Sequence, residues 1–262
     1  MAEFECRYYS RVLARNVVFY AMLPDGGGSG EEAPRCPEGR FPTVFLLHGG
    51  LEDCFAWPQK TSLVRYAQRY GLAAVAVSYE NSYLTDLRTG SDYWTWINDD
   101  LIPYVRSVFP LSARRADTFV AGASMGGYCA AKLALRRPDT FGGLAILSGA
   151  VDSGDELKGT PDPMNYRNPF FIDAFGSREQ YLGSENDVVA LLRSFEGRAE
   201  ELPKIYHCCG TKDKLYRDNT LYRDLALAIG ADITWEEAEE GHTWEFWDIC
   251  IQHAMEFFSA IH

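Results

Sequence analysis

The chain has 262 residues, 47% of them hydrophobic, and a formal net charge of −12 at pH 7. This charge argues against nucleic acid as a partner, because proteins bind phosphate backbones mainly through lysine and arginine. No segment supplies the roughly 18 consecutive apolar residues of a membrane span, so we expect a soluble protein with no membrane partner.

The cysteines and the N-terminal segment favour a cytoplasmic protein. Seven cysteines are scattered along the chain without the paired spacing of a zinc site or of a small disulfide framework. The segment from Met1 to Cys6 has neither the basic start nor the apolar stretch of a secretory signal. We therefore expect reduced thiols and a cytoplasmic location.

The predicted elements begin with two strands, Phe4–Ser10 and Asn16–Leu23, which carry β-branched and aromatic residues and should pair antiparallel at a sheet edge. A Gly- and Pro-rich stretch over 24–42 predicts an exposed loop. The strands predicted after it are Thr43–Leu47, Ala73–Ser78, Thr118–Ala121, Leu144–Leu147, Lys204–Cys208 and Ile233–Ala238. The predicted helices are Thr61–Tyr70, Tyr93–Val108, Gly127–Arg136, Tyr216–Ile229 and a C-terminal helix that includes Trp244 to Phe258.

This alternation of strands and helices implies an α/β fold with a mostly parallel central sheet and helices on both faces. We predict about eight strands within a single domain over residues 1–262. The segment 151–203 breaks the alternation, and we predict a small cap insertion there, above the strand ends where open α/β sheets bind ligands. Its aromatic residues would either shape a substrate pocket or form the cap's own core. These residues are Tyr166, Phe170, Phe171, Phe175 and Tyr181.

The segment Gly122-Ala123-Ser124-Met125-Gly126 lies between a predicted strand and a predicted helix. In such a turn the serine is held in strained backbone geometry with its hydroxyl exposed, and the flanking glycines remove side chains that would collide with the backbone. This arrangement is a nucleophile elbow, which makes Ser124 a candidate nucleophile. The alternative is a serine that caps the following helix.

A serine hydroxyl is a weak nucleophile at neutral pH, so it needs a base and a third group that orients the base. In the order typical of α/β-hydrolases, the acid follows a late strand and the histidine follows the last strand. Asp213 and His242 occupy those places. Asp218 is the nearest alternative acid, but it should start the next helix. His242 could instead cap the last helix, a role that Thr243 can also fill.

The oxyanion of an acyl-transfer intermediate needs N–H donors. His48-Gly49-Gly50 ends the first central strand in a turn whose backbone can face the serine. We predict that the backbone N–H groups of Gly50 and Met125 form this oxyanion hole.

Together these motifs resemble those of the α/β-hydrolase superfamily, and more narrowly the esterase D and S-formylglutathione hydrolase family with its tributyrin esterase-like bacterial members. The residues that carry the resemblance are Leu46-Leu47-His48-Gly49-Gly50 with Trp57, Thr85-Asp86, Asp92-Tyr93-Trp94, Phe119 to Tyr128, Cys209-Gly210-Thr211-Lys212-Asp213 and Gly241-His242-Thr243-Trp244. The resemblance covers nearly the whole chain. It implies Ser124 as nucleophile, His242 as general acid and base, and Asp213 as the residue that orients the histidine. The chain departs from these relatives in a longer loop over 25–40 and in the turn Gly-Gly-Leu-Glu-Asp after His48.

The sequence therefore predicts a serine carboxylesterase that acts on a small-molecule ester through an acyl-enzyme, without a cofactor or a metal. Short acyl groups, from acetyl to butyryl, or feruloyl-type groups are the expected substrates. One alternative is an S-formylglutathione-like thioester hydrolase, another is a non-catalytic binding protein on the same fold, and peptidase activity is a weaker third. We expect a homo-oligomer only because soluble enzymes commonly form symmetric dimers, and no residue of the sequence indicates one.

Overall fold

The computed structural model describes residues 1–25, 39–152 and 168–262. Most of the predicted loop over 24–42, the first part of the predicted cap and Tyr166 lie outside these residues. In the described part of the chain, no helix combines the length and the apolar character needed to cross a lipid bilayer.

One sheet of eight strands organises the chain, with the order β1-β2-β4-β3-β5-β6-β7-β8. The strands are β1 (Ala2–Ser10), β2 (Arg15–Leu23), β3 (Thr43–Leu47), β4 (Ala73–Val77), β5 (Thr118–Ala123), β6 (Gly143–Leu147), β7 (Lys204–Gly210) and β8 (Ile233–Ala238). β2 runs antiparallel to β1 and to β4, and all other neighbours are parallel. The prediction of a mostly parallel eight-stranded sheet with an antiparallel pair at one edge is confirmed.

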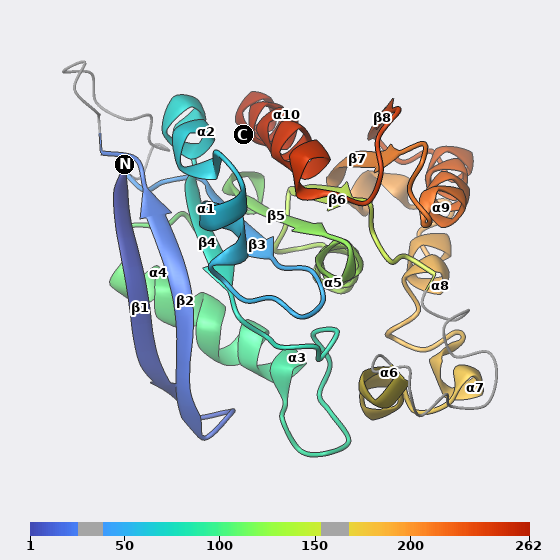
Figure 1. Cartoon of the computed structure of the whole chain (residues 1–262), viewed down its shortest axis with the longest axis horizontal. Coiled ribbons are helices and arrows are strands. Elements are labelled where there is room, and N and C mark those ends of the chain that lie inside the picture. The colour runs from blue at the N-terminus through green and yellow to red at the C-terminus, as the bar shows by residue number, and fades with distance from the viewer. Residues whose placement is uncertain (26–38, 153–167) are drawn as a thin grey trace.

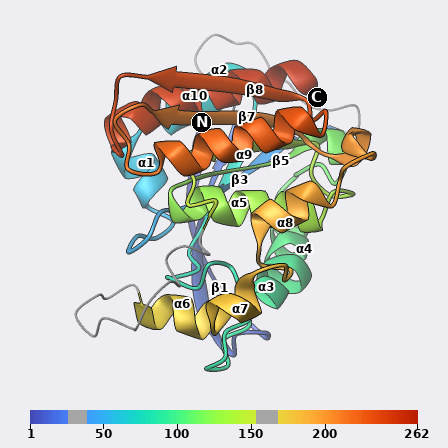
Figure 2. The same ribbon diagram turned by 90° about the vertical axis from the view of Figure 1, so that its right-hand side faces the viewer.

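Helices cover both faces of this sheet (Figures 1 and 2). They are α1 (Ala56–Lys60), α2 (Leu63–Tyr70), α3 (Tyr93–Thr95), α4 (Ile102–Val108), α5 (Met125–Arg136), α6 (Asn168–Phe175), α7 (Arg178–Tyr181), α8 (Val188–Arg193), α9 (Tyr216–Ala228) and α10 (Trp244–Ile261). Buried side chains of α2 and α10 pack on one face, and those of α4, α5 and α9 pack on the other. The central strands β3, β4, β5 and β6 are buried along their whole length. Continuous apolar runs are the pattern that burial on both faces requires.

The helix predicted over Tyr93–Val108 is interrupted by a π-helical turn, η2 (Trp96–Leu101). Pro103 lies directly after this turn, in the first residues of α4. Proline has no backbone N–H and its ring collides with the carbonyl four residues earlier, so a regular α-helical turn is disfavoured there and the wider turn takes its place.

The described part of the predicted cap contains three short α-helices, α6, α7 and α8, and a 3-10 turn, η4 (Ala199–Glu201). Of the three helices, α8 lies beside α5 (Figure 2). α7 begins with a capping box, in which the Ser177 side chain accepts from Gln180 N–H and the Gln180 side chain accepts from Ser177 N–H. At the start of α8, the Asp187 side chain accepts from the backbone N–H groups of Val189 and Ala190. These caps satisfy the backbone donors of helices that are too short to be stable alone.

Candidate active site

Ser124 occupies the turn between β5 and α5 with φ 56° and ψ −119°. This positive φ is strained for a residue with a side chain. A Cβ at Gly122 would lie 2.1 Å from the carbonyl oxygen of Gly126, and a Cβ at Gly126 would lie 2.1 Å from that of Leu47. Only glycine therefore fits on either side of the serine, and the sharp turn leaves the Ser124 hydroxyl at the C-terminal edge of the sheet.

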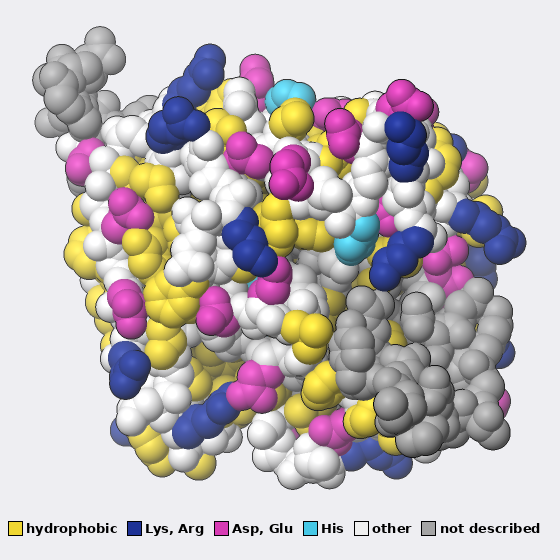
Figure 3. Space-filling model, viewed as in Figure 1, with side chains coloured by type: hydrophobic (Ala, Val, Ile, Leu, Met, Phe, Trp, Pro, Cys, Tyr) yellow, Lys and Arg dark blue, Asp and Glu magenta, His cyan; other side chains and the backbone are white. Residues whose placement is uncertain are grey.

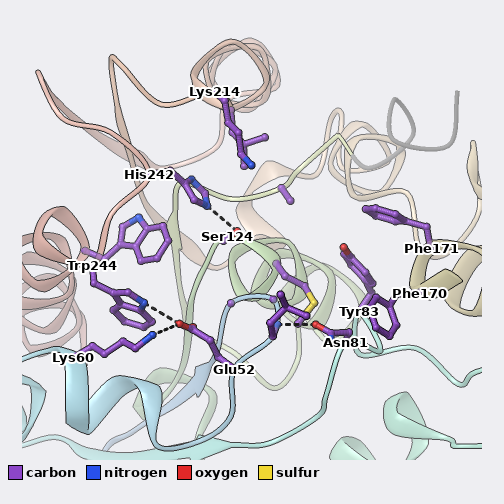
Figure 4. A pocket seen from close by; sticks show the side chains of 17 residues that line it. Glu52, Lys60, Asn81, Tyr83, Ser124, Phe170, Phe171, Lys214, His242 and Trp244 are labelled. Carbon is purple, nitrogen blue, oxygen red and sulfur yellow. Dashed lines mark hydrogen bonds and ion pairs between the residues drawn. The ribbon is translucent and has the colours of Figure 1, made fainter. Parts of the chain in front are cut away.

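The structure brings together the three side chains that the sequence singles out (Figure 4). His242 Nε2 lies 2.9 Å from Ser124 Oγ, and His242 Nδ1 lies 2.7 Å from Asp213 Oδ2. An ionised carboxylate accepts hydrogen bonds and cannot donate them. Nδ1–H therefore donates to Asp213, which leaves Nε2 free of a proton and able to accept the hydroxyl of Ser124.

Asp213 is held in the turn that follows β7. Its Oδ1 accepts the backbone N–H of Leu215 at 2.8 Å, and its side chain is buried. Burial raises the pKa of Asp213, but the hydrogen bonds from His242 and Leu215 outweigh it, so the pKa lies below its ordinary value. Asp218, the alternative acid, is the third residue of α9.

Three of the other histidines have partners away from Ser124. His48 is buried against Tyr79, with ring centroids 4.2 Å apart, and burial lowers the pKa of His48 to about 4. His207 is buried beside Asn219, and its pKa is also lowered to about 4 by burial. His253 Nδ1 lies 2.9 Å from a carboxylate oxygen of Glu236.

The predicted oxyanion donors lie on two turns that meet at Ser124. In the described part of the chain, the backbone N–H groups of Gly50 and Met125 donate to no other group. The turn that carries Gly50 is fixed on both sides. Leu51 N–H donates to Asn81 Oδ1 at 2.8 Å, and the Tyr79 hydroxyl donates to the His48 carbonyl oxygen at 2.5 Å. Both donors are thus available to a bound group.

A cavity of about 290 Å³ opens above Ser124. Five aromatic side chains share its lining with polar and charged ones, and apolar walls with a few polar groups are typical of sites for small molecules. The lining residues are Gly49, Gly50, Leu51, Glu52, Lys60, Asn81, Tyr83, Ser124, Met125, Ala150, Phe170, Phe171, Lys214, Leu215, His242, Trp244 and Trp247 (Figure 4).

The aromatic residues of the cap divide between two roles. Phe170 and Phe171 line the cavity. Phe175 and Tyr181 are buried away from it and pack against each other, with ring centroids 5.1 Å apart. Both interpretations of the cap aromatics therefore apply, each to different residues.

Sequence reasoning missed one connection across the cavity. Glu52 Oε1 accepts from Lys60 Nζ at 2.5 Å and from Trp244 Nε1 at 2.9 Å. It thereby links the turn that carries Gly50 to the loop of His242. The turn after His48 contains this glutamate, and the sequence departs there from the family that it resembles. The sequence could not show what Glu52 binds, because its partners lie 8 and 192 residues away.

Comparison with known proteins shows the family to which the chain belongs. Residues 10–248 match the Esterase family model, described as "Putative esterase". An acetyl esterase of Caldicellulosiruptor saccharolyticus is 31% identical over 267 residues, covering 100% of this chain and 99% of that protein.

Two solved structures from Staphylococcus aureus are similar over 98% of each chain. The fluorophosphonate-binding serine hydrolase FphF has a TM-score of 0.85 at 26% identity, and the S-formylglutathione hydrolase FrmB has a TM-score of 0.83 at 27% identity. The family match extends over most of the chain, and the acetyl esterase aligns from end to end. The chain therefore belongs to the Esterase family of α/β-hydrolases and is a serine carboxylesterase.

Proposed function

We propose that Ser124, His242 and Asp213 are the catalytic residues, and that the enzyme cleaves short-chain acyl and feruloyl-type esters. The observation that carries this proposal is the chain of two hydrogen bonds from Ser124 through His242 to Asp213. A base that is hydrogen-bonded to the nucleophile and oriented by a carboxylate is the arrangement that activates a serine hydroxyl.

In the first half of the reaction, Ser124 Oγ attacks the acyl carbon while His242 Nε2 takes the hydroxyl proton. Asp213 stabilises the imidazolium that forms. The N–H groups of Gly50 and Met125 bind the oxyanion, and each such donor is worth about 3 kcal/mol of transition-state stabilisation. The bond to the leaving oxygen then breaks, and His242 gives the proton to that oxygen, which leaves the acyl group on Ser124.

In the second half, a water molecule takes the place of the leaving alcohol. His242 removes one proton from the water as its oxygen attacks the acyl carbon, and the same oxyanion donors act again. Collapse of this second intermediate returns the proton to Ser124 Oγ and releases the carboxylic acid. The protein supplies every group in this sequence, so we propose that it needs neither cofactor nor metal.

The size of the cavity and the relatives support small acyl groups. A volume of about 290 Å³ lies just below the roughly 300–1,000 Å³ that small-molecule pockets span. One relative is an acetyl esterase, and a ferulic acid esterase shares the fold, with a TM-score of 0.81. The likeness to FrmB makes thioester hydrolysis the second candidate.

Hydrolysis rates with a series of esters test this proposal. We would measure kcat/KM for p-nitrophenyl esters from acetate to decanoate, for methyl ferulate and for S-formylglutathione, with wild type and Ser124→Ala. A maximum between acetate and butyrate, or with ferulate, that disappears in Ser124→Ala is the expected result. A preference for the thioester would change the proposed substrate class from esters to thioesters and would leave the proposed catalytic residues unchanged. Turnover that survives in Ser124→Ala would refute the assignment of the nucleophile.

We also propose a cytoplasmic location. The six described cysteines carry free thiols, and five of them are buried. Free thiols are the usual state of cysteine in a reducing compartment. Measurement of the protein in fractionated cells of its source would test this location.

A further inference from the structure

Lys214 lies at the mouth of the cavity, directly after Asp213 in the chain. It is exposed, and it lines the same cavity as Ser124 and His242. Figure 4 shows the ammonium end of Lys214 directed toward the space above Ser124. The backbone on either side is fixed, because Leu215 N–H donates to Asp213 Oδ1 at 2.8 Å and Tyr216 N–H donates to the Asp213 carbonyl oxygen at 3.0 Å. The turn that holds the acid thus also holds the backbone of Lys214 in place.

The charges around the cavity leave Lys214 uncompensated. The other lysine of the lining, Lys60, is paired with Glu52 at 2.5 Å. Lys214 has no ion pair within the described residues, whereas Lys212, two positions earlier, pairs with Glu239 at 3.2 Å. Acidic and basic side chains are interspersed over this face of the molecule without a basic patch (Figure 3). In a chain of net charge −12, Lys214 is therefore the lysine of this lining whose charge is left to attract an anion.

The position of Lys214 also indicates which half of the substrate it meets. The acyl oxygen turns toward the N–H groups of Gly50 and Met125, because they stabilise the oxyanion. The leaving oxygen turns toward His242 Nε2, which returns the proton to it. Lys214 lies on the His242 side of Ser124 (Figure 4). The leaving group therefore passes beside Lys214.

We propose that Lys214 binds a carboxylate on the alcohol half of the substrate, so that the enzyme prefers esters with an anionic leaving group. This inference rests on the proposed function, since it uses the orientation that Ser124 and His242 impose. A solvent-exposed ion pair contributes a modest attraction, so the expected preference is about fivefold in kcat/KM and falls with added salt.

Two aryl acetates of matched shape test this subsite. 3-Carboxyphenyl acetate carries the anion, and 3-carbamoylphenyl acetate is its neutral counterpart. We would measure kcat/KM for both with wild type, Lys214→Met, Lys214→Glu and Lys214→Arg, with Lys212→Met as the matched control. Comparing each variant with wild type on both esters cancels the difference in chemical reactivity between the two leaving groups.

Lys214→Met should lower kcat/KM for the carboxylate ester about fivefold and that for the amide ester less than twofold. Lys214→Glu should lower the former further, Lys214→Arg should retain the preference, and Lys212→Met should leave both values unchanged. Equal losses on both esters, or an equal effect of Lys212→Met, would overturn the subsite while the esterase assignment stands. Failure of wild type to hydrolyse the neutral ester would overturn the proposed function, and the inference with it.

Discussion

His242 Nε2 lies 2.9 Å from Ser124 Oγ, although 118 residues separate the two in the chain. β5 and α5 hold the serine, while the loop between β8 and α10 holds the histidine. Parallel strands bring their carboxyl ends to one edge of the sheet, so loops that are distant in sequence meet there.

Asp213→Asn should lower kcat about 10⁴-fold, because an asparagine amide can donate to His242 Nδ1 and favour the wrong tautomer. The carboxylate accepts from both His242 and Leu215, and the asparagine side chain is similar in size, so the fold should persist. Steady-state kinetics with p-nitrophenyl acetate and circular dichroism would measure the two effects. A loss of less than tenfold would show that another group orients the histidine.

Gly126→Ala should abolish activity, whereas Gly50→Ala should retain it within about twofold. A Cβ at Gly126 would lie 2.1 Å from the Leu47 carbonyl oxygen, so the elbow would have to open. A Cβ at Gly50 would meet nothing closer than Asn81 Oδ1 at 3.8 Å, and the backbone N–H would remain. Activity and thermal unfolding of both variants check this difference. Retained activity in Gly126→Ala would mean that the turn is less constrained than described.

Phe171→Ala should shift the acyl preference toward longer chains, because Phe171 lines the cavity. Its ring packs beside that of Tyr83, another residue of the lining, with centroids 4.8 Å apart. Removing the Phe171 ring therefore enlarges the cavity on that side. Phe175→Ala is the matched control, since Phe175 is equally buried but lies outside the lining. Both changes should cost about 3–5 kcal/mol of stability.

The ratio of kcat/KM for p-nitrophenyl octanoate to that for p-nitrophenyl acetate separates the two variants. We expect the ratio to rise in Phe171→Ala and to stay at the wild-type value in Phe175→Ala. Equal ratios in both variants would mean that the cap aromatics influence the site only through stability.

Several parts of this architecture could be predicted from the sequence because they depend on local patterns. The buried strands are apolar runs, and the elbow at Ser124 is a short motif with a defined context. Asp213 could be separated from Asp218 by its place directly after a strand. The link from Glu52 to Trp244 could not be predicted, because it joins side chains 192 residues apart. Likewise, Phe171 lines the cavity and Phe175 does not, although both lie on one face of α6 four residues apart, so only tertiary packing decides which of them reaches the site.

Lys132 of α5 is a fully buried lysine that contacts Tyr83, a residue of the cavity lining. Its Nζ donates to the Tyr83 carbonyl oxygen at 2.6 Å, to Thr85 Oγ1 at 2.8 Å and to Asn186 Oδ1 at 3.2 Å. Burial lowers the pKa of Lys132 from 10.5 to about 7. Between these values the unfolded chain binds more protons than the folded protein, so this lysine makes stability rise with pH from about 7 to 10, by at most about 1.4 kcal/mol per pH unit.

Lys132→Met removes this dependence. The free energy of unfolding of wild type minus that of Lys132→Met should therefore be flat below pH 7 and should increase toward pH 10. Urea unfolding of both proteins at several pH values would measure it. A difference that stays constant or decreases over this range would show that Lys132 keeps its proton in the folded protein.

Ser124 is tested as the nucleophile most directly by locating the residue that a fluorophosphonate modifies, through intact-mass measurement and peptide mapping of wild type, Ser124→Ala and His242→Ala. We expect a single adduct on Ser124 in wild type, no adduct in Ser124→Ala and much slower labelling in His242→Ala. A stoichiometric adduct on another residue, or no adduct in the folded wild-type protein, would contradict the assignment of Ser124 as the nucleophile.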